Sequence, residues 1–378
     1  MHRLQLHYTL SRDSSPAQVR NPLIDLLQAV SSQGSISGGA RALGLSYRHV
    51  WGELKRWEQE LGNELLVWEK GQAARLTDFG AKLMWAERQA QARLAPQIEA
   101  LRAELERSFA LAFDDQVHML TLYASHDEAI SALREYALRD SEDTGRLHLD
   151  VRFTGSVDAI RALNEGRCVM AGFHTLLDTS RHSRSERSYK PLLQPGLHKI
   201  IGFARRTQGL MVAPGNPLAL RAITDVITAQ ARFANRALGS GTRVVLDELL
   251  DQAGLTGAAL PGDGRVEPSH AAVAQAVASG QCDTGLGIAA AAYQAGLDFV
   301  PLVEERYHLV CLKSALEQPG VQHLRQLLQT PHWQAHVGAI AGYAPEQSGQ
   351  VLSMRKVLPW WNFAQKKAAA PTAGPATK

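Results

Sequence analysis

Apolar residues recur at steps of three and four in two stretches near the start of the chain, residues 21–32 and 46–61, and this spacing predicts a helix in each. The intervening GSISGGARALGLS predicts a shorter helix, which the hydroxyl of Ser35 or Ser37 would cap by accepting a free amide of its first turn. Gly44 supplies a tight turn, and Ser46 caps the helix that follows. Three short helices in this order predict a helix-turn-helix.

The last of these helices carries hydrogen-bond donors outside its apolar stripe, and donors of this kind suit DNA phosphates and base edges. Two short apolar runs follow, at 65–69 and 73–76, and the turn between them completes a predicted β-hairpin wing. The alternative is a helical hairpin whose basic face is only solvated. We predict DNA contacts from Ser35, Ser37, Ser46, Tyr47, Arg48, His49, Lys55, Arg56 and Lys70.

The ordered pattern GSIS…ARALGLSYRHVW…LTDFG resembles the winged helix-turn-helix of ModE-type and LysR-type bacterial regulators. The resemblance covers residues 21–90. It implies that the partner of this unit is a double-stranded DNA operator.

After the wing, Thr77 can cap a long helical stretch that runs to residue 111, with Pro96 inside it. The proline predicts a kink or two consecutive helices. The apolar seam of this stretch fits a helix that pairs with its copy in a homodimer, since helix-turn-helix regulators usually bind two half-sites. The alternative is a helix packed on its own domain, and the LysR-type resemblance leaves a tetramer open. The seam comprises Leu83, Ala86, Ala90, Leu94, Ile98, Leu101 and Leu105.

From residue 116 the pattern changes to strands that alternate with helices, which is typical of α/β layers with a largely parallel sheet. The length of this region favours two lobes with a cleft between them. The polar, basic stretch 178–190 predicts a surface loop, and the tail from residue 365 predicts disorder. Strands are predicted at 119–124, 148–154, 169–173, 200–204, 209–213, 232–235, 284–288, 299–302 and 308–312.

These patterns predict an α+β multidomain protein: an N-terminal winged helix-turn-helix with a long linker helix, and a C-terminal α/β two-lobed domain. The expected parts are a DNA-binding domain at 1–76, a linker and dimerisation helix at 77–112, a ligand-sensing domain at 113–345 and a C-terminal segment with a disordered tail at 346–378.

Four strand-to-helix junctions of the α/β region carry small hydroxyl or basic residues. In parallel α/β sheets ligands bind beyond the carboxyl ends of the strands, and a helix start offers free amides to an anion. For any single serine, simple helix capping is the alternative. The candidate ligand contacts at these junctions are Ser125, His126, Ser156, His174, Thr175, Arg236, Ser240, Gly241, Thr242 and Arg243.

The stretches LTLYASHDEAI, FTGSVDAIRALNEGRCVMAGFHT and FANRALGSGTRVVLDELL resemble the substrate-binding-protein-like domain of bacterial regulators, similar to periplasmic binding proteins of the molybdate and tungstate class. This resemblance implies two lobes, of the type 2 kind, that close on a small anion: molybdate, tungstate or a molybdenum-cofactor-related ligand. ModE-type regulators usually carry β-barrel sensors instead, and molybdate sites favour neutral donors. Arg236 and Arg243 therefore keep an organic carboxylate such as formate open.

Three other readings of the α/β region compete. His126, Asp127 and His174 could hold a metal, although no close pair of histidines supports one. The region could be an enzyme acting on an anionic metabolite, but nothing in it forms a nucleophile elbow, phosphate loop or metal cluster. It could also be a scaffold that has lost its ligand. We predict a regulator, not an enzyme, with no cofactor.

Net charge, cysteine content and overall hydropathy add little to this picture. A net charge of +3 over 378 residues is weak support for nucleic acid, so the DNA prediction depends on the local pattern. Three distant cysteines argue against a disulfide framework or a zinc site. No apolar run reaches the length of a membrane helix, and the first residues lack the apolar stretch of a secretory signal. We therefore expect a cytoplasmic protein.

Overall fold

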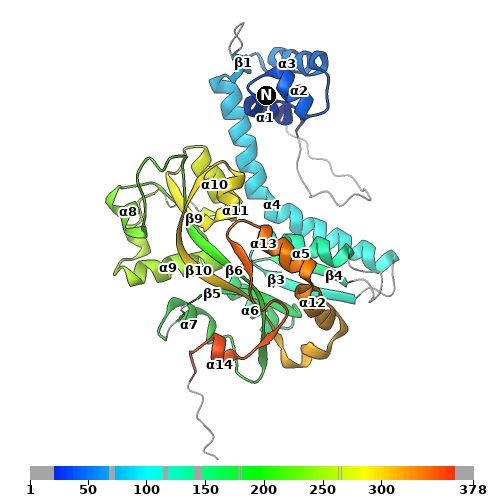
Figure 1. Ribbon diagram of the computed structural model, residues 1–378, viewed down its shortest axis with the longest axis vertical. Helices are drawn as coiled ribbons and strands as arrows, with labels where there is room; N and C mark the ends of the chain where they lie inside the picture. The colour runs from blue at the N-terminus through cyan, green and yellow to red at the C-terminus, as the bar shows by residue number, and fades with distance from the viewer. Residues whose placement is uncertain are drawn as a thin grey trace, which may run out of the picture.

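The structure is a computed structural model that describes residues 21–67, 73–113, 118–139, 147–177, 179, 181–262, 264 and 266–361. Figure 1 shows the N-terminal helices at one end of the molecule, joined by the long helix α4 to a larger α/β part. This is the predicted fold class, with an N-terminal helix-turn-helix, a long helix and a two-lobed α/β domain.

The N-terminal unit contains α1 (Pro22–Gln33), α2 (Ile36–Ala42) and α3 (Tyr47–Leu61). Ser35 caps α2 by accepting the amide of Gly38 at 3.0 Å, whereas Ser37 lies inside that helix. Gly44 adopts a φ of 66°, the left-handed conformation that the turn requires. The helices bury a shared apolar core that includes Leu23, Leu27, Val30, Ile36, Val50, Leu54 and Leu65.

The wing is a short antiparallel pair, β1 (Leu66–Val67) and β2 (Arg75–Leu76), in which Leu66 is the register partner of Leu76. The turn that joins the two strands, with the predicted contact Lys70, lies outside the described residues. The predicted strands at 65–69 and 73–76 are therefore confirmed only at 66–67 and 75–76.

Helix α4 (Asp78–Phe113) is one continuous helix of 36 residues, capped by Thr77, whose Oγ1 accepts the amide of Gly80 at 3.0 Å. Pro96 lies inside it, and Figure 1 shows the helix changing direction about midway along its length. Met84, Ala92 and Ala103 are buried apolar residues in the described part of the helix, whereas Leu101 in the predicted seam is 57% exposed. Within one chain, Ala86, Ala90 and Leu101 of the predicted seam are exposed, whereas its other four residues are partly buried.

A ten-stranded sheet runs through the α/β part, with its main path in the order β4-β3-β5-β10-β6-β9-β7-β8. The first lobe is built on the parallel strands β3 (His118–Ala124), β4 (Leu147–Phe153) and β5 (Met170–Leu176), with helices α5 (Glu128–Arg139) and α6 (Ser156–Asn164). Its apolar strand residues are buried because helices cover both faces of the sheet.

The second lobe is built on the parallel strands β7 (Phe233–Arg236), β8 (Val266–Glu267) and β9 (Thr284–Ile288). Each strand-to-helix connection is short, so hydroxyl and basic residues at the strand ends stay close to the helix that follows. The helical elements of this lobe are α8 (Ile223–Thr228), α9 (Gly241–Gln252), η1 (Gly257–Ala259), α10 (His270–Ala278) and α11 (Ala289–Gln294).

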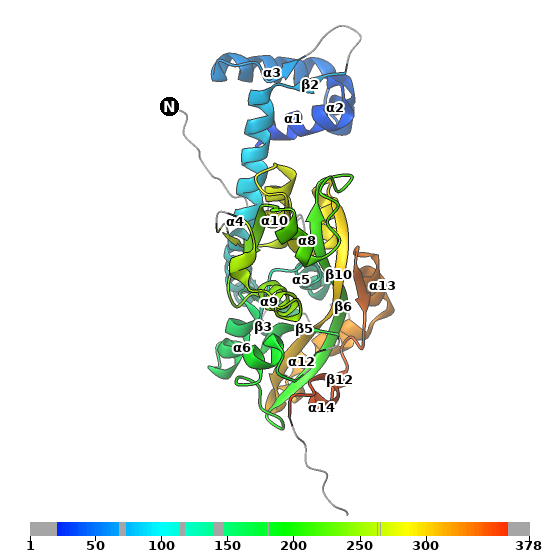
Figure 2. The ribbon, with the colours of Figure 1, turned by 90° about the vertical axis from the view of Figure 1, so that its left-hand side faces the viewer.

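Two antiparallel strands of 15 residues each, β6 (His198–Val212) and β10 (Asp298–Leu312), connect the lobes. Figure 2 shows them side by side along the α/β part. The sequence predicted four separate strands here. The prediction was wrong because polar residues 205–208 and 304–307 looked like breaks, although they lie within the strands and Arg206, Gln208 and Glu305 are buried.

The C-terminal residues add to the first lobe. After η2 (Lys313–Glu317) come α12 (Pro319–Gln329) and α13 (Pro331–Ala339), and then β11 (Tyr343–Pro345) and β12 (Val351–Leu352), which pair with β6. The short helix α14 (Met354–Val357) follows, and Trp360 is buried in the core. Residues 346–361, expected to follow the sensing domain, thus extend its sheet, whereas the predicted disordered tail lies outside the described residues.

The predicted surface loop at 178–190 contains a short helix, α7 (Arg184–Tyr189), in which Tyr189 is fully buried. The ring of Tyr189 packs edge-on against Phe173 at 5.4 Å. A six-residue helix is too short to show an apolar period, so the sequence pattern missed it. None of the helices in the described ranges is both long and apolar enough to span a membrane.

Gly39 and Gly52 allow a matched test of the helix-turn-helix. A Cβ on Gly39 would lie 2.9 Å from the backbone nitrogen of Val30, whereas a Cβ on Gly52 meets nothing within 4 Å. We expect Gly39→Ala to destabilise the unit by about 1–3 kcal/mol through overpacking. Gly52→Ala should stabilise it by up to about 1 kcal/mol, since alanine is the better helix former. Amide hydrogen exchange over 21–67 measures both, and equal exchange in the two variants would contradict the packing of α1 on α2.

Candidate functional site

The start of α3 presents an exposed polar surface. Tyr47, Arg48 and His49 all lie exposed in its first turn, directly after the cap, where the Oγ of Ser46 accepts the amide of His49 at 3.2 Å. The ring of Tyr47 stacks on Trp51 at 6.4 Å between centroids, which holds the aromatic side chain at the helix surface. The first turn of a helix after a tight turn is the part that reaches base edges in helix-turn-helix proteins.

The two later basic residues of α3 are engaged within the helix. Lys55 pairs with Glu58 at 2.7 Å, and Arg56 pairs with Glu53 at 2.6 Å. Arg48 forms no ion pair within the described part of the chain. All three side chains remain predicted DNA contacts, but Arg48 presents the less neutralised charge.

The strand-to-helix junctions of the two lobes meet directly. In the first lobe, the hydroxyls of Ser125 and Ser156 lie 3.3 Å apart and are buried. A Cβ on Gly155 of that lobe would lie 2.8 Å from the carbonyl oxygen of Gly239 in the second. The lobes are therefore in contact at these junctions, and the predicted convergence of separate junctions on one place is observed for these residues.

His174 at the end of β5 faces the same junction. A Cβ on Gly241, the first residue of α9, would lie 2.4 Å from Cδ2 of His174, so only glycine fits there without a shift of the imidazole. The ring of His174 also lies against Tyr307, with 3.9 Å between centroids. Burial, followed by the charge of Arg206, holds the pKa of His174 well below its usual range, so the imidazole is neutral.

Arg236 and His270 complete the second-lobe side. Arg236 ends β7, and its guanidinium is buried; its Nε and Nη1 have no hydrogen-bond partner among the described residues. Burial and the neighbouring Arg206 lower the pKa of Arg236 to about 10, against the opposing charge of Glu267. Nε2 of His270 lies 3.4 Å from Oγ1 of Thr242. We call Ser125, Ser156, His174, Arg236, Thr242 and His270 the inter-lobe site.

A buried ion-pair network borders the inter-lobe site. Arg206 of β6 forms ion pairs with Asp127 and with Glu305 of β10, and Gln208 donates to Glu305 at 2.8 Å. Burial opposes the charge of Arg206, but the carboxylates of Glu305 and Asp127 more than offset it and hold its pKa well above the ordinary value. Burial raises the pKa of Glu305, although Arg206 opposes this.

Sequence reasoning missed most of this network. Arg206, Gln208 and Glu305 lie inside strands that the pattern divided, and Tyr343, which donates to Asp127, lies after the last predicted strand at 308–312. Asp127 was suggested as a metal ligand, and His270 was not among the candidate ligand contacts. The available signal was a polar stretch flanked on both sides by apolar strand residues, at 205–208 and again at 304–307.

The structure places four predicted ligand contacts in other interactions. His126 lies 3.7 Å from Glu99 of α4. Thr175 lies 3.1 Å from His308, because Thr175 and His174 are successive residues of β5 and so face opposite sides of the sheet. Arg243 pairs with Asp247 at 2.9 Å. The hydroxyl of Ser240 caps α9 and donates to the carbonyl of Ala237 at 2.7 Å.

The suggested metal ligands have separate partners. Asp127 is engaged by Arg206, His126 faces Glu99 and His174 lies against Tyr307. Within the described ranges, no cluster of three or more histidine, cysteine, aspartate or glutamate side chains could hold a metal ion. The arrangement observed here suits an anion better than a cation.

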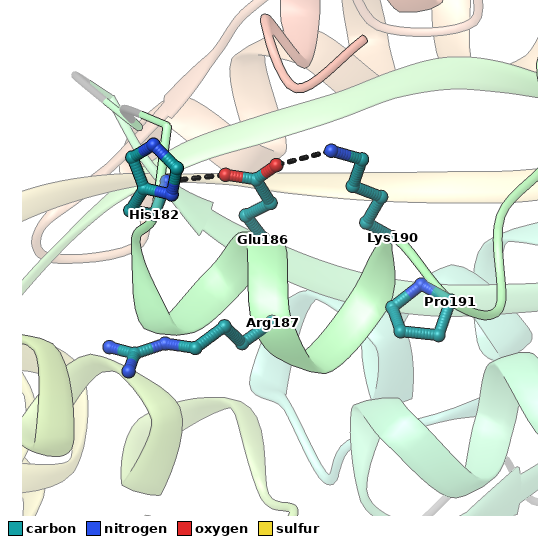
Figure 3. A pocket seen from close by; sticks show the side chains of 5 residues that line it. All are labelled: His182, Glu186, Arg187, Lys190 and Pro191. Atoms are coloured by element: carbon teal, nitrogen blue, oxygen red, sulfur yellow. Dashed lines mark hydrogen bonds and ion pairs between the residues drawn. The ribbon is translucent and has the colours of Figure 1, made fainter.

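A separate pocket opens on the surface beside α7 (Figure 3). It is lined by His182, Glu186, Arg187, Lys190 and Pro191. Glu186 accepts from Lys190 at 2.5 Å, and Arg187 pairs with Asp251 of α9 at 2.9 Å. Because these charges already have partners, the inter-lobe site is the stronger candidate for ligand binding.

The chain matches two described families. Residues 23–81 match the bacterial regulatory helix-turn-helix protein, lysR family, and residues 138–329 match the PBP superfamily domain. The second match covers more than half of the chain, so the chain belongs to the PBP superfamily, with a lysR-family helix-turn-helix before it. This combination is the architecture of LysR-type regulators, a class of DNA-binding transcriptional regulators and not of enzymes.

Two sequence relatives are named as uncharacterized proteins. The chain is 31% identical over 201 residues to the uncharacterized protein YvgK of Bacillus subtilis. The aligned stretch covers 53% of this chain and 64% of YvgK. It is 29% identical over 111 residues, 29% of this chain, to an uncharacterized protein in the ferredoxin 2Fe-2S gene 5′ region of Clostridium pasteurianum, 98% of which is covered. A hydrogen peroxide-bound OxyR mutant of Corynebacterium glutamicum is similar at a TM-score of 0.41 and 16% identity, over 85% of this chain and 97% of that chain.

His308 makes the stability of the α/β part sensitive to acid. Burial, followed by the charge of Arg306, lowers its pKa to about 3, below the value of 6.5 expected when the chain is unfolded. The unfolded chain therefore binds the proton first, and stability is complete above pH ~6.5 and lost as the pH falls.

We expect the free energy of unfolding of the wild type to fall as the pH is lowered from 6 to 4. The fall should be steeper than in His308→Gln by about 1.4 kcal/mol per pH unit, because glutamine has no group that titrates. Urea titrations followed by near-ultraviolet circular dichroism measure the difference. Parallel pH profiles of the two proteins would show that His308 is not the group responsible.

Proposed function

We propose that this protein is a one-component transcriptional regulator that binds an operator as a homodimer and senses a small anion at the inter-lobe site. The family matches support the DNA-binding class, and the exposed first turn of α3 supplies a suitable surface. Such a protein would act in the cytoplasm. Ligand binding would favour one arrangement of the lobes over another and so change the fit of the dimer to paired half-sites.

Arg236 carries the ligand proposal. A buried cation is costly unless an opposite charge and hydrogen bonds compensate it, yet Nε and Nη1 of Arg236 lack partners within the described residues. His174 and His270 are held neutral, so they can donate or accept a hydrogen bond without demanding a counter-ion. One guanidinium, two neutral imidazoles and nearby hydroxyls suit a small anion.

The ligand we propose is molybdate, tungstate or a molybdenum-cofactor-related anion, on the resemblance of the junction sequences to molybdate- and tungstate-class binding proteins. The residues we assign to it are Ser125, Ser156, His174, Arg236, Gly241 and Thr242 from the predicted set, with His270 added. The remaining predicted contacts His126, Thr175, Ser240 and Arg243 would take part only after a rearrangement of their present partners.

An organic carboxylate is the second candidate, and one observation favours it. Oε2 of Glu305 and Oε1 of Gln208 are buried acceptors with no partner among the described residues. A plain oxyanion offers them no hydrogen, whereas a carboxylate that also bears a hydroxyl or amino group would satisfy an acceptor and Arg236 together.

We propose that the dimer forms through α4. The exposed seam residues Ala86, Ala90 and Leu101 lie on a different face from the buried Met84, Ala92 and Ala103. A helix that uses one face on its own chain therefore keeps a second apolar face for a partner copy, and a tetramer stays possible through further contacts.

Arg48→Ala should weaken binding to a random-sequence DNA duplex. It should also make the slope of log K against log salt concentration shallower by about 0.9, the value for one lost phosphate contact. Lys55→Ala is the matched control and should have the smaller effect, because Glu58 already neutralises Lys55. Fluorescence anisotropy at several salt concentrations measures both. Wild-type affinity and slope in Arg48→Ala would count against the proposed docking of α3.

A thermal-shift panel with molybdate, tungstate, sulfate, phosphate, formate and hydroxycarboxylates tests the site. An anion at a concentration of about 100 times its Kd should stabilise the fold by about 2.7 kcal/mol. Each kcal/mol of stabilisation raises Tm by ~2–4 °C in a domain of this size. Arg236→Gln should abolish the shift, whereas Arg243→Gln, the matched control whose partner is Asp247, should keep it.

The panel also separates the candidates. Stabilisation by molybdate and tungstate but not sulfate would support an oxyanion sensor. Stabilisation by hydroxycarboxylates alone would support the second candidate. The absence of any shift, or a shift that survives Arg236→Gln, would contradict the inter-lobe site as the sensor.

A further inference from the structure

Helix α4 contacts both lobes of its own chain. Its N-terminal half is attached to the second lobe: the side-chain amides of Gln89 and Gln281 donate to each other at 2.8 and 2.7 Å. The hydroxyl of Ser269 donates to the carbonyl of Ala92 at 3.2 Å. Arg93 forms a bidentate pair with Glu267 at 2.9 and 3.0 Å.

The C-terminal half of α4 is attached to the first lobe. Glu99 accepts from the hydroxyl of Ser131 in α5 at 3.2 Å and lies 3.7 Å from Nε2 of His126. About two turns further on, Arg107 pairs with Asp150 of β4 at 3.4 Å. The helix therefore spans the boundary between the lobes.

Pro96 lies between the two sets of attachments. Because proline has no amide hydrogen and its ring crowds the preceding turn, the helix lacks one backbone hydrogen bond there and bends most easily at that point. Figure 1 shows α4 turning as it passes from the N-terminal helices to the first lobe. The weakest point of the helix thus coincides with the change from one lobe to the other.

The attachments on the second lobe adjoin the inter-lobe site. Glu267 is the register partner of Arg236 in the paired strands β7 and β8, and its charge favours the protonated form of Arg236. The carboxylate of Glu267 is fully buried and pairs with Arg93 of α4. Ser269 caps α10 directly before His270. On the first lobe, His126 lies between Ser125 and Asp127.

We propose that α4 is part of the sensor: Arg93 and Glu267 position Arg236, and Pro96 is the hinge at which α4 bends when the lobes move. The proposal concerns regulation of the inter-lobe site and so builds on the proposed function. The site residues are buried while the lobes touch, so an anion enters only if the lobes separate. Separation moves the two sets of attachments apart, and α4 accommodates the movement at Pro96.

The bend reaches the DNA-binding unit directly. Helix α1 packs against α4, and Met84 of α4 belongs to the apolar core of the helix-turn-helix. A change of angle at Pro96 therefore swings α3 relative to the first lobe without any change inside the helix-turn-helix. By linkage, whatever holds the bend also changes the affinity of the inter-lobe site for its anion.

The test needs neither ligand nor DNA, so it can fail while the proposed function stands. Spin labels at Gln59→Cys on α3 and Gln326→Cys on α12, both exposed positions, report the distance between the DNA-binding unit and the first lobe by pulsed electron resonance in the full chain, diluted with unlabelled protein. Hydrogen exchange over 125–127 and 235–243 reports the inter-lobe site.

We expect Arg93→Gln to broaden the label distance and to raise exchange at the inter-lobe site by about tenfold, because Glu267 loses its partner. Pro96→Ala should restore the missing backbone hydrogen bond and straighten α4. We expect the distance between the two labels to change and its distribution to narrow. Hydrogen exchange at the same segments should rise, because the straighter helix pulls on its attachments. Lys82→Gln removes the same charge from an exposed position of α4 and should change neither readout.

Two results would overturn the proposal. If Arg93→Gln and Pro96→Ala both match Lys82→Gln in the exchange of 125–127 and 235–243, α4 does not act on the site. If Pro96→Ala leaves the label distance unchanged, Pro96 is not the hinge. Failure of every anion in the thermal-shift panel would leave these two readouts as they are, and would count against the proposed function alone.

Discussion

The ion pairs of Arg206 with Asp127 and Glu305 hold the α/β part together at its centre. Arg206 lies in the middle of β6 with 1% of its side chain exposed, Glu305 lies on the neighbouring strand β10, and Asp127 lies at the first-lobe junction. Removing one partner of such a buried group leaves an uncompensated charge, at a cost of about 3–5 kcal/mol. These ion pairs therefore fix how the two long strands meet the first lobe.

The same ion pairs decide which charges remain for a ligand. Glu305 and Asp127 satisfy Arg206, so Arg236 is left as the buried cation whose Nε and Nη1 lack partners among the described residues. The two arginines also lower the pKa of the nearby imidazoles, which burial has already lowered, and this keeps His174 and His270 neutral. An anion placed there would give Arg236 the hydrogen-bond partners that its Nε and Nη1 lack among the described residues.

The linker helix gives this electrostatic arrangement a route to the DNA-binding unit. Glu267 pairs with Arg93 of α4, and it is also the register partner of Arg236, whose protonated form its charge favours; in the proposed sensor this carboxylate links the site to the helix. Helix α4 in turn packs on the core of the helix-turn-helix through Met84. Physical contact is thus continuous from the lobes to α3, which is what coupling between two distant sites requires.

The sequence alone determined the local features, because their causes lie within a few residues. Ser35 and Ser46 cap helices, Gly44 makes the turn between them, and hydroxyl residues follow the strands of the α/β part. Only the tertiary structure decided which of these side chains meet. Arg236 faces the site while Arg243, seven residues on, turns to Asp247, and His174 faces it while Thr175 does not. Arg206, Glu305 and Tyr343 come together from distant segments, and their polarity in the sequence looked like loop because only burial against one another makes it compatible with a strand.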